Sequence, residues 1–239
     1  RLRYLCIVSS NLDEFFEVRA APHITAAKNG ETKGLYTEAS FEALSAQAHD
    51  LVARQYALYN ESLVPAFAAQ GIRIVPHGER SEGQKRWVHD YFMREVRPLL
   101  IPVGLDPAHP FPQVANKSLN FIVRLKGRDA FGRENEIAIV KVPRALPRLI
   151  RMPPKVAPKE ALFVSLSSIV RAHLHDLFPG REVTEFSQFR VTRHSDLALD
   201  EEDVRNLRTA LRQGLRSGLR NRFLANCCDI VEPPATTLP

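Results

Sequence analysis

Apolar residues recur every three or four positions through the first part of the chain. Over residues 5–18 and again over residues 40–69 this spacing places them on one face of a helix. A polar segment at residues 29–30 joins the two stretches, and Pro65 is expected to kink the second one near its end. Gly71 then stands where a glycine commonly terminates a helix. The pattern therefore predicts a long helical hairpin.

After Gly71 the pattern changes to a mixture of strands and helices. The run at 119–125 alternates between apolar and polar positions, and a weaker alternation at 136–142 follows a turn, which predicts a β-hairpin. The other predicted elements are strands at 72–75 and 185–192, helices at 81–98, 165–178 and from Asp200 onward, and an irregular proline-rich segment at 146–158. This order indicates the α+β class, with a helical N-terminal domain over residues 1–71 and a mixed α+β domain over residues 72–239.

Composition restricts the class of protein only loosely. The 239 residues are 44% hydrophobic and 25% charged, which is typical of a globular protein. The sequence contains neither the run of about 18 apolar residues that a membrane span needs nor a signal peptide. We therefore expect a cytoplasmic location and leave open membrane association as part of a complex. Arg1 already lies within a helical pattern and is not preceded by a methionine, so we expect the natural N-terminus to lie upstream.

Cysteine and histidine positions argue against a disulfide framework and against a metal site. Cys227 and Cys228 are adjacent and Cys6 is far from both, so we expect reduced thiols. None of the eight histidines stands in a His-x3-His arrangement, and no Cys-x2-Cys pair occurs. His173 and His175 are two residues apart, which places them on different faces of a helix. The sequence predicts no metal site.

Motifs of the common phosphate-binding and hydrolytic enzymes are also missing. The sequence contains no Gly-x4-Gly-Lys-Ser/Thr loop, no Gly-x-Gly-x2-Gly turn and no Gly-x-Ser-x-Gly elbow. If the protein handles ATP, it does not use one of these cradles within these residues. No catalytic residue is predicted in this chain.

Charge gives the strongest physical signal, in the last predicted helix. The net charge of +6 favours an anionic partner, and nucleic acid, nucleotide, inorganic polyphosphate and acidic lipid all fit it. A row of arginines repeats every four residues beside a leucine face, at Arg208, Arg212, Arg216 and Arg220. Guanidinium groups in such a row can bind the phosphates of a polyanion, whereas the alternative is a solvated helix face without a partner. No helix-turn-helix, RNA-recognition or zinc-finger signal supports nucleic acid as that partner, and we expect none.

Asn11 allows two interpretations. Its side-chain amide offers donors and an acceptor that can bind the edge of a base. The alternative is that Ser9, Ser10 and Asn11 form a helix cap or a kink, with Asp13 and Glu14 on the solvated side; these residue types favour such positions, so local chemistry by itself favours the cap.

Three segments resemble the large bacterial polyphosphate kinases, in the order and at separations like those of that family. The first is Ser9-Ser10-Asn11-Leu12-Asp13-Glu14-Phe15-Phe16 within residues 5–19. The second runs from Phe111-Pro112 to Asn116-Lys117-Ser118-Leu119-Asn120, and the third is residues 189–197 followed by Asp200-Glu201-Glu202. The resemblance covers residues 1–220, whereas residues 226–234 depart from the family's pattern and leave the fold after about residue 222 open.

The resemblance implies a reversible transfer of the terminal phosphate of ATP to inorganic polyphosphate through a phosphorylated histidine. It also implies that Asn11 contacts the ATP base, which reverses the local argument for a cap. In the family, the histidine, the magnesium ligands and most phosphate-binding residues belong to two C-terminal domains, so this chain is expected to be inactive alone. The second domain corresponds to the family's head domain, which implies a homo-oligomer formed through it. A non-catalytic polyanion-binding or assembly module, the product of a degenerate gene, is the alternative.

Overall fold

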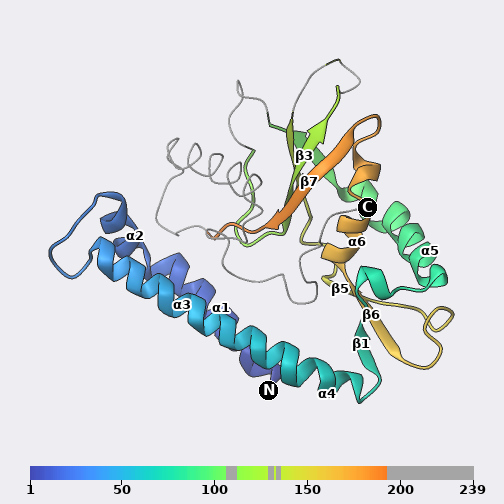
Figure 1. Ribbon diagram of the computed structural model, residues 1–239, viewed down its shortest axis with the longest axis horizontal. Coiled ribbons are helices and arrows are strands. Elements are labelled where there is room, and N and C mark those ends of the chain that lie inside the picture. Colours follow the sequence, from blue (N-terminus) through green and yellow to red (C-terminus); the bar gives the residue numbers. More distant parts are fainter. Residues whose placement is uncertain (106–111, 129–131, 133–135, 193–239) are drawn as a thin grey trace.

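The computed structural model describes residues 1–105, 112–128, 132 and 136–192, and its ribbon is shown in Figure 1. The chain begins with helix α1 (Leu2–Glu14), which continues through a wide π-helical turn, η1 (Phe15–Arg19), and leads into α2 (Ala21–Lys28). Pro22 lies in the first turn of α2, where the missing N–H costs no hydrogen bond within the helix. These elements form the first arm of the predicted hairpin.

The second arm is a single helical rod with a local change of pitch. Helix α3 (Glu38–Leu58) begins at a capping box in which the Thr37 hydroxyl accepts from the backbone N–H of Ser40. The rod continues through the π-helical turn η2 (Tyr59–Leu63) into α4 (Val64–Ala68). The wide turn ends two residues before Pro65, which cannot donate a helical hydrogen bond, so a change of helical pitch occurs where the sequence predicted a kink.

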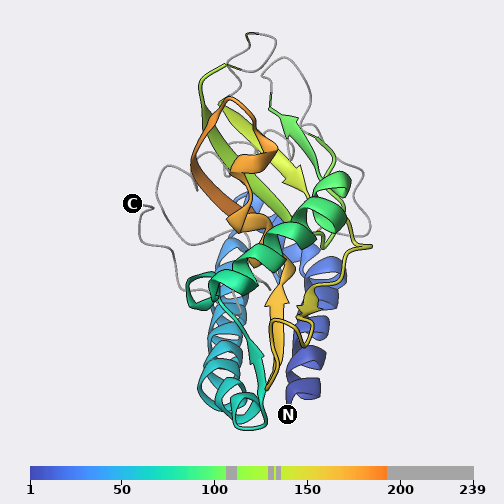
Figure 2. The ribbon, with the colours of Figure 1, turned by 90° about the vertical axis from the view of Figure 1, so that its right-hand side faces the viewer.

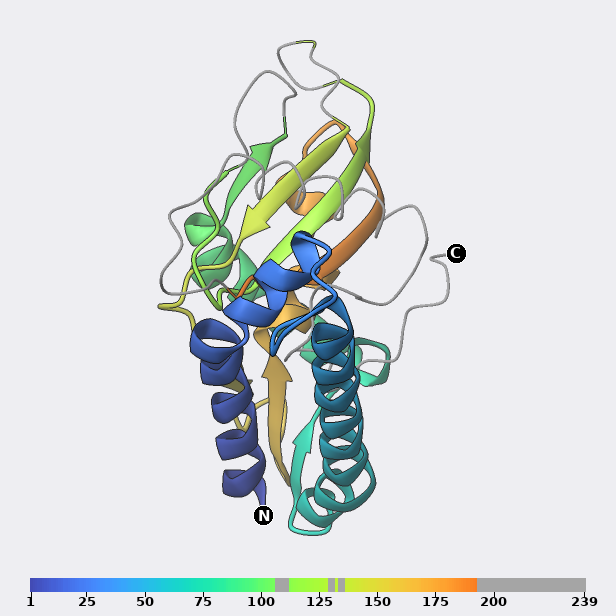
Figure 3. The ribbon, with the colours of Figure 1, turned by 90° about the vertical axis from the view of Figure 1, so that its left-hand side faces the viewer.

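The two arms lie side by side as antiparallel rods, and Figure 3 shows strand β6 visible between them. Near the N-terminus, the Gln55 amide donates to the Leu5 carbonyl (2.7 Å) and to the Ser9 hydroxyl (2.6 Å). At the other end α2 packs against α3. These contacts confirm the predicted helical hairpin.

Gly71 joins the helical arms to the first of two sheets. Its φ of 70° is the left-handed conformation in which glycine avoids a steric cost, and its carbonyl accepts from the N–H of Ala161. The sheet has the order β1-β6-β5, made of β1 (Ile72–Ile74), β6 (Ala161–Ser165) and β5 (Leu149–Arg151). Strands β1 and β6 are parallel, and β5 is antiparallel to β6.

The second sheet is antiparallel throughout and has the order β2-β4-β3-β7. Its strands are β2 (Ile101–Gly104), β4 (Ile137–Lys141), β3 (Asn120–Lys126) and β7 (Glu182–Phe189). Both faces of this sheet are covered, because Phe121 and Val123 belong to the larger buried cluster of the protein and Ile122 belongs to a second one. The pairing of β3 with β4 confirms the predicted hairpin.

Short helices contribute to the larger buried cluster, and Figure 2 shows their arrangement beside the sheets. Helix α5 (Glu82–Tyr91) begins at the predicted cap, Ser81, and runs on through η4 (Phe92–Val96) and η5 (Arg97–Leu99). The remaining ones are η3 (His77–Glu79), α6 (Leu166–Ala172) and η6 (His175–Leu177). Val88, Phe92, Ile169 and Val170 extend from these helices into the cluster.

Three sequence predictions for this region were incomplete. The helix expected over 165–178 ends at Ala172, because His173 leaves the helical conformation (φ −124°, ψ 17°) and a separate 3-10 turn follows. The segment 146–158, expected to be irregular, contains β5. Strands β2 and β6 were not predicted. The helix expected from Asp200 onward lies outside the described residues, and among those described no helix has the length and apolarity of a membrane span.

Candidate functional site

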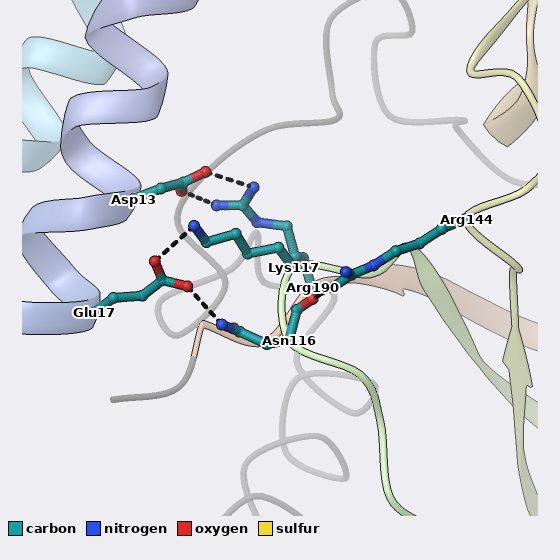
Figure 4. Close-up of polar contacts among 6 residues, drawn as sticks. All are labelled: Asp13, Glu17, Asn116, Lys117, Arg144 and Arg190. Atoms are coloured by element: carbon teal, nitrogen blue, oxygen red, sulfur yellow. Dashed lines mark hydrogen bonds and ion pairs between the residues drawn. The ribbon is translucent and has the colours of Figure 1, made fainter. Parts of the chain in front are cut away.

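A polar cluster forms where the end of α1 meets the beginning of β3 and the end of β7 (Figure 4). Asp13 and Glu17 come from α1 and η1, four residues apart and therefore on one helix face. Asn116 and Lys117 precede β3, and Arg190 follows β7. The three segments that resemble one family in the sequence thus converge at one place in the fold.

Asp13 and Arg190 form the central ion pair of the cluster. Arg190 Nη1 donates to Asp13 Oδ2 at 3.2 Å, and Nη2 pairs with Oδ1, so the contact is bidentate. The side chains are only 15% and 16% exposed, which removes most of the water that weakens a surface pair. A paired guanidinium fork fixes orientation as well as distance. The pair therefore holds the C-terminal turn of α1 in a defined position against the head domain.

Glu17 makes the second connection. Lys117 Nζ lies 2.6 Å from Glu17 Oε2, and the Asn116 amide donates to Oε1 at 2.5 Å. The hydrogen bond from Lys117 is the main cause that lowers the pKa of Glu17, and Asn116 acts in the same direction against the effect of burial. Glu17 is therefore a carboxylate at neutral pH and accepts hydrogen bonds from both Lys117 and Asn116.

The turn that carries Asn116 and Lys117 is held in an uncommon conformation. Lys117 has a φ of 56°, which few residues other than glycine adopt. Its N–H donates to the Val191 carbonyl at 2.8 Å, and the Arg144 guanidinium donates to the Asn116 carbonyl. A strained backbone of this kind persists where several contacts fix it. In this conformation the side chains of Asn116 and Lys117 both reach Glu17.

Asn11 lies on α1 two residues before Asp13, and its side chain is exposed. The helix runs without interruption through Ser9, Ser10 and Asn11, so these residues form neither a cap nor a kink in this structure. Ser9 instead accepts a hydrogen bond from Gln55. The contact of Asn11 with the ATP base stays a prediction, and the structure places this amide on α1.

The other predicted binding residues cannot be placed. The arginine row at Arg208, Arg212, Arg216 and Arg220 lies outside the described residues. Conversely, Glu17, Lys117 and Arg190 were not singled out as site residues, although they stand within or beside the segments of resemblance. Pairing across 177 positions, as in Asp13 and Arg190, has no signal in residue spacing.

Comparison with known proteins gives the family directly. The family model of the polyphosphate kinase N-terminal domain matches residues 1–75, and that of the polyphosphate kinase middle domain matches residues 83–224. The polyphosphate kinase of Neisseria meningitidis serogroup B is 48% identical over 219 residues, which cover 90% of this chain and 32% of the relative. That of Pseudomonas aeruginosa strain PAO1 is 47% identical over 221 residues, covering 91% and 32% respectively.

A solved structure gives the same fold. The crystal structure of polyphosphate kinase from Porphyromonas gingivalis superposes with a TM-score of 0.69 at 24% sequence identity, over 99% of this chain and 39% of that one. The chain spans about a third of the length of the curated relatives it matches. Matches to two domain models in sequence, together with this fold, lead to one conclusion: the chain belongs to the polyphosphate kinase family.

Proposed function

We propose that this chain supplies the N-terminal and head parts of an enzyme that reversibly transfers the terminal phosphate of ATP to inorganic polyphosphate. The supporting observation is the convergence of the three family-like segments at the Asp13–Arg190 pair. Phosphoryl transfer depends mostly on positioning and on electrostatic stabilisation of the transferred group. In this proposal the chain helps to position the base of ATP. It does so through Asn11 on α1, which the Asp13–Arg190 pair holds in place.

The carboxylates of the cluster do not fit a magnesium ion. Magnesium in such enzymes is held by one or two free carboxylates together with phosphates and water. Asp13 and Glu17 are instead paired with Arg190 and Lys117, and the cation partners would repel a second cation. We therefore derive no step through magnesium from these residues, and propose that its ligands lie in the family's C-terminal domains.

Assembly is the second role that we propose for the head domain. Strand β2 is at the edge of its sheet; its first residue, Ile101, is 67% exposed, and Leu99, two residues before it, is 46% exposed. An edge strand with exposed apolar side chains is a common place for pairing between copies. These features support the proposal of a homo-oligomer formed through this domain. A non-catalytic polyanion-binding or assembly module is the alternative function.

The chain alone is expected to be inert with ATP and polyphosphate. Its 239 residues contain none of the common phosphate cradles, and the family's phosphorylated histidine is expected outside them. Incubation with ATP labelled at the terminal phosphate and a polyphosphate primer should label neither the protein nor the polymer. In the same assay, the full-length protein should become labelled and should also transfer label to the polymer. Label on the 239-residue chain above background contradicts the first expectation, and an inactive complete product favours the assembly module.

The Asn11→Ala variant of the complete protein is expected to raise the KM for ATP about threefold to tenfold. The expected change corresponds to one net hydrogen bond from a neutral amide, which contributes about 0.5–1.5 kcal/mol. If this bond is equally strong in the ground and transition states, kcat stays unchanged. Steady-state kinetics at varied ATP measure this, and Ser10→Ala, an exposed neighbour on α1, serves as the control. An unchanged KM for ATP in a folded Asn11→Ala variant would contradict the proposed contact between Asn11 and the ATP base.

A further inference from the structure

A second polar cluster lies outside the site described above, where α5 packs against the C-terminal end of α6 (Figure 1). It consists of His89 from α5, His173 at the C-cap of α6 and Asp176 from η6. One ligand atom from each of the three residues lies within 4.8 Å of the others. No spacing rule predicts this group, because His89 and His173 are far apart in the sequence.

Two of the three residues are already held in place. His173 Nδ1 lies 2.9 Å from Asp176 Oδ2, and the buried ring of Phe92 stacks on the His173 ring with centroids 4.6 Å apart. The His173 side chain is only 13% exposed. His89 is exposed, and its ring centroid is 5.1 Å from that of His173. The cluster is therefore a fixed histidine and carboxylate with one adjustable histidine beside them.

The donor set suits a zinc ion. Two imidazole nitrogens and one carboxylate oxygen are ligands that zinc accepts, with water completing four-fold coordination. With bonds of about 2.0–2.1 Å, the ligand atoms of a tetrahedral zinc lie about 3.3 Å apart. The present separations reach that value if the exposed His89 side chain turns toward the other two. Imidazole ligands also favour zinc over magnesium or calcium, which prefer oxygen.

A third histidine contacts the carboxylate of this cluster. His175 Nε2 lies 3.4 Å from Asp176 Oδ1, on the carboxylate oxygen that does not face His173. A histidine in that position can orient the carboxylate, as partners of metal ligands commonly do.

We propose that His89, His173 and Asp176 bind one zinc ion, which ties α5 to the segment after α6. The ordinary alternative is a histidine–carboxylate hydrogen bond with an unrelated histidine nearby. The two differ in what His89 does, since it forms part of the zinc site and has no role in the hydrogen bond between His173 and Asp176. This proposal does not depend on the phosphotransfer reaction.

The test is zinc binding to the 239-residue chain with Cys6, Cys227 and Cys228 replaced by serine, so that thiolates cannot compete. Calorimetric titration with zinc chloride should give one ion per chain and a melting temperature that rises with zinc concentration. His89→Ala and Asp176→Asn should each weaken zinc binding at least tenfold. His175→Ala should weaken it less. His49→Ala, which removes another exposed histidine, on α3, should bind zinc as the parent does.

His89 is exposed, so its replacement is expected to leave the circular dichroism spectrum unchanged, and the His89→Ala result decides the proposal. If the parent, His89→Ala and His49→Ala bind zinc with equal affinity, the proposal is overturned, and the bound zinc is held by histidines elsewhere in the chain. Absence of zinc binding by the parent overturns it as well. Selective loss in His89→Ala and Asp176→Asn supports it.

Discussion

Replacing Asp13 by alanine is expected to loosen α1 from the head domain and to speed the hydrogen exchange of its amides by roughly a hundredfold to a few thousandfold. Arg190 would be left as a mostly buried cation without its carboxylate, since only 15% of its side chain is exposed. Breaking a buried pair in this way costs about 3–5 kcal/mol, and each 1.4 kcal/mol is a factor of ten. Exchange measured by mass spectrometry on peptides covering residues 2–19 reports this opening directly.

Glu14→Ala is the matched control, because Glu14 is the next residue, carries the same charge and is exposed. A surface replacement of this kind changes stability by at most about 0.5 kcal/mol. Arg190→Met in the Asp13→Ala background should recover part of the protection, because it removes the uncompensated charge. Equal exchange in Asp13→Ala and Glu14→Ala would show that the ion pair does not hold α1, and would remove the positional argument for Asn11.

The docking of α1 links the fold to the proposed reaction. Asn11 and Asp13 are two residues apart on one continuous helix, so a pair that fixes Asp13 also fixes the backbone position of Asn11. Glu17 adds a second fixed point at the next turn, through Lys117 and Asn116. We propose that Asp13 and Glu17 orient α1, while the Asn11 amide, two residues before Asp13, contacts the ATP base.

Sequence alone predicted the elements that a local signal specifies, such as a capping residue, an alternating pattern or a terminating glycine. The cap at Ser81, the hairpin of β3 and β4 and the helix terminator Gly71 all follow from local chemistry, and all are present. Strand β6 was missed because residues 161–164 form a continuous apolar run directly before α6 and do not show the alternation of a half-exposed strand. Its pairing with β1 and β5 defines it as a strand.

Only the part of the candidate site that lies within one local segment could be predicted from the sequence. Asn11 could be proposed because it stands within a recognisable segment, whereas its supporting ion pair joins Asp13 to a residue 177 positions later. Such contacts depend on how the sheets and the helical arms are arranged, which residue spacing does not determine. The cluster of His89, His173 and Asp176 is hidden from the sequence in the same way, because α5 and α6 come together only in the folded chain.

The arginine row of the last predicted helix is expected to bind polyphosphate through charge alone. Arg208, Arg212, Arg216 and Arg220 repeat at the spacing of one helix face, in a chain whose family name refers to a polyanion. Binding by released counterions weakens steeply with salt, and log affinity falls by about 0.7–0.9 per neutralised phosphate for each tenfold rise in salt. The double variant Arg212→Gln, Arg216→Gln should therefore weaken binding about tenfold or more at low salt and flatten the slope by roughly 1–2.

Glutamine is also a good helix former, so the variant should keep its helix content. The matched control is Arg148→Gln with Arg151→Gln, which removes the same charge from exposed positions near β5. A salt titration of polyphosphate binding on the parent and the two variants distinguishes a local site from net charge. If both double variants lose affinity equally, the net charge of the chain carries the binding. If neither changes affinity or slope, the arginine row is a solvated helix face. A weaker and flatter curve confined to the Arg212 and Arg216 variant, with its circular dichroism spectrum preserved, assigns the polyanion contact to this row.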